Sequence, residues 1–141
     1  MQLFKRTPDS FFHNVENFNF KTKYIYGLVD FNDGYKDFRI AYIDENHDGA
    51  SGTLLFIHGH PTWSYLWRHL IPIAIKLNFR ILAIDLPGFG KSDKPMKKDF
   101  FSFNNYRKIL LNFIDKLDLK NINLVLHEWG GTLGLTLPIE D

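Results

Sequence analysis

Three short apolar runs, each followed at once by polar side chains, constrain the fold of this chain more than any other feature. The runs occupy residues 53–58, 80–85 and 122–127, and stretches with a helical period separate them. Apolar runs that alternate with helices predict a mostly parallel sheet with helices on both of its faces. We therefore expect an α/β fold. Ligands bind such sheets at the carboxyl ends of the strands, where this chain places the following polar residues: His58, His60, Asp85, His127 and Glu128.

Two stretches predict the helices. Residues 65–77 carry apolar side chains at positions 66, 70, 71, 74 and 77, but Pro72 removes a backbone donor, so the helix is expected to kink or to start late. Ser102 is a suitable N-cap for a second, amphipathic helix that ends near Asp118. A third helix is expected to open at Trp129.

The N-terminal part predicts an arm and a hairpin. Residues 1–23 show no clear period, and we interpret them as an arm packed by Phe11, Phe12, Phe18 and Phe20. Weak alternation over residues 24–31 and 38–43, with Asn-Asp-Gly after the first stretch, predicts two antiparallel strands. We expect one domain over residues 1–141, in which residues 24–141 supply the sheet and helices.

Composition narrows the class of protein. The chain has 141 residues, 45% of them hydrophobic, which suffices for one domain with a sizeable core. A net charge of +1 does not indicate a nucleic-acid partner, and the absence of cysteine excludes disulfides and cysteine-based zinc sites. No apolar run approaches ~18 residues, so we expect no membrane span and a cytoplasmic location.

The stretch 122–134 has the layout of a nucleophile elbow. A strand, a sharp turn and a helix follow one another, and Glu128 stands at the apex of the turn. Gly130 and Gly131 are expected to prevent a collision with the neighbouring strand. The backbone N–H of Trp129 would lie at a helix N-terminus, where it can hold an oxyanion. A buried strand that runs into a glycine-containing helix remains the alternative for this stretch alone.

Several motifs together resemble one family. They are Arg6-Thr-Pro-Asp9, His58-Gly-His-Pro-Thr-Trp-Ser-Tyr-Leu-Trp-Arg68, Asp85-Leu-Pro-Gly-Phe-Gly-Lys-Ser-Asp-Lys-Pro95, Glu128-Trp-Gly-Gly131 and Gly134-Leu-Thr-Leu-Pro138. In this order they look like the haloalkane dehalogenases of the α/β-hydrolase superfamily. Epoxide hydrolases share the His-Gly-x-Pro and elbow patterns and are kept as an alternative, but Pro-Thr-Trp-Ser-Tyr-Leu favours the dehalogenases.

The resemblance implies a two-step hydrolysis of a small halogenated alkane. A carboxylate displaces the halide to form an alkyl ester, and a histidine then activates the water that cleaves this ester. By position, Glu128 is the catalytic nucleophile. Trp129 would bind the halide through its indole and the oxyanion through its backbone N–H, and His60 would supply the second oxyanion-hole donor. No metal or organic cofactor is implied.

Three departures from the family pattern put the activity in doubt. The apex residue is Glu rather than Asp, and a displacement of about 1 Å can cost on the order of 10²-fold in rate. His60 replaces an acidic or amide residue. The family's cap, last strands, catalytic acid and catalytic histidine lie downstream of the elbow, so the resemblance implies a partial α/β-hydrolase fold, the N-terminal half only.

We therefore expect no dehalogenation above background by this chain alone. The second hypothesis is a non-catalytic fragment of a broken gene, which would depend on pairing with a missing C-terminal half. Because the strand 122–127 is normally central in this fold, its edge is expected to be unpaired here.

Two further patterns invite a functional interpretation. Gly88-Phe-Gly-Lys-Ser92 invites a phosphate-binding loop, but a P-loop needs Gly at position 85 and a helix directly afterwards, so a structural loop is favoured. His58 and His60, with His127 and Glu128, could gather as metal ligands. A strand-end histidine beneath the site and a separate loop histidine are favoured over this metal site.

Overall fold

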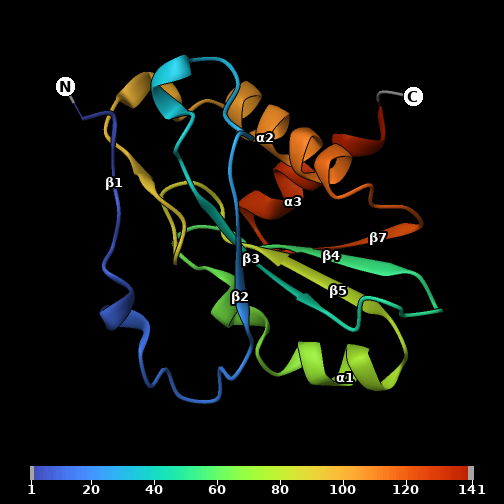
Figure 1. Ribbon diagram of the computed structural model, residues 1–141. Helices are drawn as coiled ribbons and strands as arrows, with labels where there is room; N and C mark the ends of the chain where they lie inside the picture. Colours follow the sequence, from blue (N-terminus) through green and yellow to red (C-terminus); the bar gives the residue numbers. More distant parts are fainter. Residues whose placement is uncertain (1, 140–141) are drawn as a thin grey trace.

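A five-stranded mixed sheet forms the centre of the protein, seen in a computed structural model that describes residues 2–139 (Figure 1). The strand order is β2-β3-β5-β4-β7. The strands are β2 Thr22–Ile25, β3 Ile40–Glu45, β4 Thr53–Ile57, β5 Arg80–Ile84 and β7 Ile122–Leu126. The three apolar runs predicted as buried strands are β4, β5 and β7. They pair in parallel with β4 in the middle, whereas β3 is antiparallel to both β2 and β5.

Helices cover both faces of the sheet, as the alternation of elements predicts. α1 (Leu70–Lys76) lies on one face, and α2 (Phe103–Lys116) and α3 (Trp129–Gly134) lie on the other (Figure 1). The core is accordingly divided in two. The side chains of Leu55, Leu82 and Phe113 belong to the cluster beneath α2, and Phe56, Ile71 and Ala83 belong to the cluster beneath α1.

Local sequence explains where the helices begin. The Oγ of Ser102 accepts a hydrogen bond from the backbone N–H of Asn105 at 3.2 Å, so the predicted N-cap of α2 is confirmed. The expected late start of the first helix is also confirmed. A 3-10 turn occupies Ser64–Trp67, and α1 begins at Leu70, which places Pro72 in the first turn, where its missing N–H has no helical partner to lose.

The predicted antiparallel pairing of the first two strands is confirmed, but the predicted length of the first strand is wrong. β2 ends at Ile25 rather than continuing to residue 31. Gly27 has a φ of +70°, which breaks the extended conformation. The connection that follows contains a 3-10 turn at Asp33–Tyr35, where the side chain of Asn32 accepts the N–H of Gly34 at 2.9 Å.

The N-terminal arm is attached by pairing and by charge. β1 (Phe4–Lys5) pairs antiparallel with β6 (Lys94–Pro95). The guanidinium of Arg6 donates to both carboxylate oxygens of the fully buried Asp93, at 2.8 and 2.7 Å. Phe18 is buried as expected, but Phe11 is 75% exposed, so the prediction that Phe11 packs the arm is wrong.

Strand β7 stands at one edge of the sheet. Within residues 2–139 it pairs with β4 alone, and four of its five residues are only partly buried. This agrees with the unpaired edge that the sequence predicts. No helix within residues 2–139 is both long enough and apolar enough to cross a membrane.

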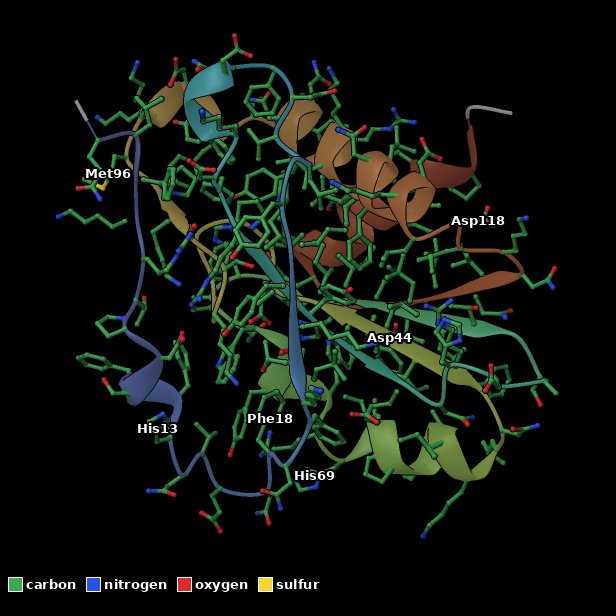
Figure 2. The ribbon with its side chains drawn as sticks, viewed as in Figure 1. His13, Phe18, Asp44, His69, Met96 and Asp118 are labelled. Atoms are coloured by element: carbon green, nitrogen blue, oxygen red, sulfur yellow. The ribbon has the colours of Figure 1, made fainter. Side chains whose placement is uncertain are left out.

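Asp44 links three neighbouring strands. Its carboxylate, 4% exposed, accepts two hydrogen bonds from Arg80 on β5 at 3.0 and 3.1 Å and one from Lys23 on β2 at 3.1 Å (Figure 2). Burial acts to raise the pKa of Asp44, but the hydrogen bonds and charges of Arg80 and Lys23 outweigh it and lower the pKa. The carboxylate therefore stabilises the fold where it is ionised.

We expect Asp44→Asn to lower the free energy of unfolding by about 1–3 kcal/mol, because Arg80 then loses a charged acceptor. The folded-state pKa is depressed, so the native contribution is complete above the unfolded pKa and disappears as pH falls through the lower folded one. Urea denaturation between pH 3 and pH 7 measures both effects. Asp48→Asn, at a fully exposed side chain nearby, is the matched control and should change neither. An equal loss in both variants would contradict the assignment.

Candidate active site

The predicted elbow is present between β7 and α3. β7 ends at Leu126, α3 begins at Trp129, and Glu128 lies between them with φ 50° and ψ −114°. A positive φ is unfavourable for a residue with a Cβ and persists only where surrounding structure imposes it. The conformation turns the chain sharply and leaves the Glu128 side chain exposed at the carboxyl edge of the sheet.

Two glycines make the sharp turn possible. A Cβ on Gly130 would come within 2.1 Å of the Ile57 carbonyl oxygen, and a Cβ on Gly59 would come within 2.7 Å of the Glu128 Cβ. The β4 end and the elbow can therefore approach only because both positions lack side chains. The expectation for Gly131 is wrong, because its Cβ would meet nothing within 4 Å.

The register of β4 and β7 brings the two halves of the site together. Ile57 is paired with Leu126, so the residues that follow each strand lie side by side. The Oε2 of Glu128 accepts the backbone N–H of His60 at 2.7 Å and that of Trp129 at 2.5 Å. These two hydrogen bonds lower the pKa of Glu128, because they favour the carboxylate over the acid.

A cavity of about 340 Å³ opens at this carboxylate. Its lining residues are His60, Phe101, Ser102, Tyr106, Glu128 and Trp129. The imidazole of His60 packs edge-on against Phe89, with ring centroids 4.5 Å apart, and lies 6.5 Å from the Trp129 ring. An anionic oxygen at the rim of a cavity lined largely by aromatic side chains can attack an apolar electrophile that binds in the cavity.

Sequence reasoning missed the wall that α2 contributes. Phe101, Ser102 and Tyr106 lie at the beginning of α2, and the Tyr106 hydroxyl donates to the Pro87 carbonyl at 2.7 Å. The N-cap at Ser102 located the helix start in the sequence. The distance between this start and the elbow depends on how α2 packs, which no local pattern records.

His58 lies beneath the site and cannot serve it directly. It is fully buried, its Nε2 accepts the Leu86 N–H at 2.9 Å, and its Nδ1 lies 2.9 Å from the Gly59 carbonyl oxygen. An acceptor Nε2 and a donor Nδ1 define a neutral ring, and burial lowers the pKa of His58 accordingly. This is the favoured strand-end role. The alternative metal site would require at least three His, Asp or Glu side chains close together, and residues 2–139 contain no such group.

Asp85 and the glycine-rich loop are structural. The Asp85 carboxylate accepts the backbone N–H groups of Ser64 and Lys91, both at 2.8 Å. The loop continues into β6, whereas a phosphate-binding P-loop is followed directly by a helix. Residues 88–92 therefore do not form a P-loop.

Two adjacent glycines of α3 provide a matched pair of variants. Gly130→Ala places a methyl group against the Ile57 carbonyl and should destabilise the protein by about 3 kcal/mol. Gly131→Ala meets open space within the helix and should stabilise it by up to about 1 kcal/mol. Thermal and urea unfolding of both variants measure the difference. Equal effects would show that the elbow is not confined by β4.

Because two backbone N–H groups stabilise the ionised form, we expect the pKa of Glu128 to lie below that of an ordinary glutamate. Carbon-13 NMR of the side-chain carboxyl, with Glu128→Gln to assign the signal, measures its midpoint. A blocked Glu peptide provides the reference. A midpoint equal to or above that of the peptide would contradict the hydrogen bonds to His60 and Trp129.

Comparisons with known proteins agree with this geometry. A model of the α/β hydrolase fold family matches residues 52–140, more than half of the chain. The haloalkane dehalogenase of Psychrobacter cryohalolentis is 40% identical over 136 residues, which are 96% of this chain and 44% of that protein. The dehalogenase of Mycolicibacterium paratuberculosis is 36% identical over 136 residues, with the same two shares covered.

Solved structures show the same relation. Haloalkane dehalogenase DpaA from Paraglaciecola agarilytica NO2, described as tetrameric, superposes with a TM-score of 0.90 at 43% identity and covers 97% of this chain and 44% of that one. Epoxide hydrolase VrEH1 from Vigna radiata has a TM-score of 0.72 at 23% identity, covers 86% and 34%, and supports the fold alone. The chain spans less than half the length of these dehalogenases; it belongs to the α/β-hydrolase fold family and fits the N-terminal half of a haloalkane dehalogenase.

Proposed function

We propose that this chain carries the nucleophilic part of a haloalkane dehalogenase site, with Glu128 as the nucleophile. The clamp on one carboxylate oxygen carries the proposal. Oε2 accepts both backbone N–H groups, and within residues 2–139 Oε1 accepts none, so Oε1 is the oxygen available for attack. The lowered pKa of Glu128 keeps the carboxylate ionised near neutral pH.

The first step is a displacement at carbon. Oε1 attacks the carbon that bears the halogen, the new C–O bond forms as the C–halogen bond breaks, and the halide leaves with the bonding electrons. The product is an alkyl ester of Glu128. The Trp129 indole, which lines the same cavity, is proposed to donate its N–H to the leaving halide.

The second step is hydrolysis of this ester. Water must attack the ester carbonyl, and the N–H groups of His60 and Trp129 would hold the oxyanion that develops on Oε2. The step also needs a general base. Among the described residues that line the cavity His60 is the one histidine, and its ring packs against Phe89. We therefore propose that the chain alone forms the ester without sustained turnover. This single release of halide replaces the expectation from the sequence that the chain releases none above background.

The longer side chain of Glu128 is compatible with this proposal. Its carboxylate reaches both amide donors at 2.7 and 2.5 Å despite the additional methylene. The nucleophilic oxygen is thereby held at a defined place, although this place differs from the one that an aspartate would give.

Incubation with 1-bromobutane tests the nucleophile. We expect at most about one bromide released per chain and a butyl ester on the peptide that contains Glu128, detected by mass spectrometry. Glu128→Gln should abolish both, and His127→Gln, at the neighbouring position, is the matched control that should retain them. If the wild-type chain releases many bromide ions per chain and this release requires Glu128, the proposal that the site lacks turnover is refuted. If no butyl ester forms on the wild-type chain, the assignment of Glu128 as the nucleophile is refuted. Styrene oxide in place of the bromide examines the epoxide hydrolase alternative.

Completion by a second chain is the other part of the proposal. The relatives are more than twice as long, and β7 presents an open edge next to a cavity of about 500 Å³ that includes Ile122, Leu124 and Leu137. We propose that a C-terminal half pairs there. The cytoplasmic location stays a prediction.

Coexpression with the remaining part of the Psychrobacter cryohalolentis enzyme tests this pairing. We expect copurification and repeated halide release, both lost with Leu124→Pro, because proline removes a donor from the open edge of β7. The β4 side of β7 keeps its donors, which alternate with Leu124 along the strand and include the N–H of His127 bound to the Ile57 carbonyl. Glu128→Gln should copurify without releasing halide. If wild-type chain and partner elute separately, the pairing is refuted.

A further inference from the structure

A second cavity lies on the other side of the glycine-rich loop, between the N-terminal arm and β2. It has a volume of about 180 Å³. Its lining residues are Asp9, Phe12, His13, Thr22, Tyr24 and Lys91, and the described residues that line the candidate active site include none of them. His13 and Phe18, labelled in Figure 2, mark the part of the arm that faces this region.

The amine of Lys91 is held in this cavity by neutral groups. Its Nζ donates to the Thr22 hydroxyl oxygen at 2.7 Å. It lies 5.6 Å from the ring centroid of Phe12 and 5.5 Å from that of Phe18. Within residues 2–139 no carboxylate forms a salt bridge with it, unlike Arg6, which pairs with Asp93.

The carboxylates nearest to Lys91 are already engaged elsewhere. Asp9 is bound by Arg39 at 2.6 Å, and Asp85 accepts two backbone N–H groups. Burial is the largest influence on Lys91 and lowers its pKa; Asp85 and Asp9 oppose this effect, and the positive charge of Arg39 adds to it. His13 and Tyr24 complete the titratable groups that line the cavity.

We propose that Lys91 is a site of Nε-acylation by small acyl donors, such as anhydrides and acyl phosphates, which enter the cavity between the arm and β2. Desolvation activates a lysine as a nucleophile because more of the amine is neutral at a given pH. The neutral amine attacks the acyl carbon and forms an N–C bond. The C–O bond to the leaving carboxylate or phosphate breaks, and the amine releases a proton to solvent.

Acylation would alter the contacts of the arm. The amide that replaces the ammonium carries no charge, so the attraction to the Phe12 and Phe18 rings is lost. Arg6 and Asp9 remain as ionic attachments of the arm. The modification therefore loosens one attachment of the arm without disturbing Glu128.

Competitive labelling of the folded wild-type chain tests the proposal. Trace deuterated acetic anhydride is added at pH values from 6 to 11, the chain is then unfolded and fully acetylated with the ordinary reagent, and peptides are quantified by mass spectrometry. We expect Lys91 to label several-fold faster than the exposed Lys98 at pH 7.5, with a lower midpoint. A midpoint equal to or above that of Lys98, or label on Lys91 only after unfolding, overturns the proposal.

A matched pair of variants separates chemistry from mere exposure. Thr22→Val removes the acceptor of the ammonium and should move the Lys91 midpoint still lower, because the charged form loses its hydrogen bond. Thr132→Val, at an exposed threonine of α3, should leave it unchanged. If Thr22→Val leaves the midpoint unchanged, the cavity does not control the amine. Acetyl phosphate as the reagent should modify the same lysine.

Discussion

The parallel pairing of β4 with β7 is the contact on which the candidate site depends. It fixes Ile57 opposite Leu126, and this register places the backbone N–H of His60 within 2.7 Å of the Glu128 carboxylate. A shift of one residue would turn every side chain of β7 to the other face of the sheet and would separate these two groups. The chemistry of the elbow is therefore a consequence of strand register.

The strained backbone at Glu128 shows how the surrounding structure supports this register. A positive φ at a glutamate is unfavourable, and such a conformation persists only where the surrounding structure imposes it. Gly59 and Gly130 permit the close approach. Beneath them, His58 joins the end of β4 to Leu86 after β5 through its ring nitrogen. One buried neutral imidazole thus ties together the loops that follow neighbouring strands.

Ion pairs secure the sheet and the N-terminal arm. Asp44 is bound by Lys23 and Arg80 from the two neighbouring strands, and Asp93 is bound by Arg6 from the N-terminal arm. Buried carboxylates of this kind stabilise a fold only when their hydrogen bonds are satisfied, and these two are. Lys91 contrasts with them, because its partners are a hydroxyl and two aromatic rings.

The sequence by itself determined the three parallel strands, the N-cap at Ser102, the apex position of Glu128 and the resemblance to haloalkane dehalogenases, because these rest on local patterns of period, capping and motif. It failed where packing decides. The strand predicted over residues 24–31 ends at Ile25, and Gly131 proved uncrowded. Only the tertiary structure decided that one oxygen of Glu128 takes both amide donors, that α2 walls the cavity and that the arm encloses Lys91. Apart from the N–H of the adjacent Trp129, these contacts join residues far apart in the chain, so no local pattern encodes them.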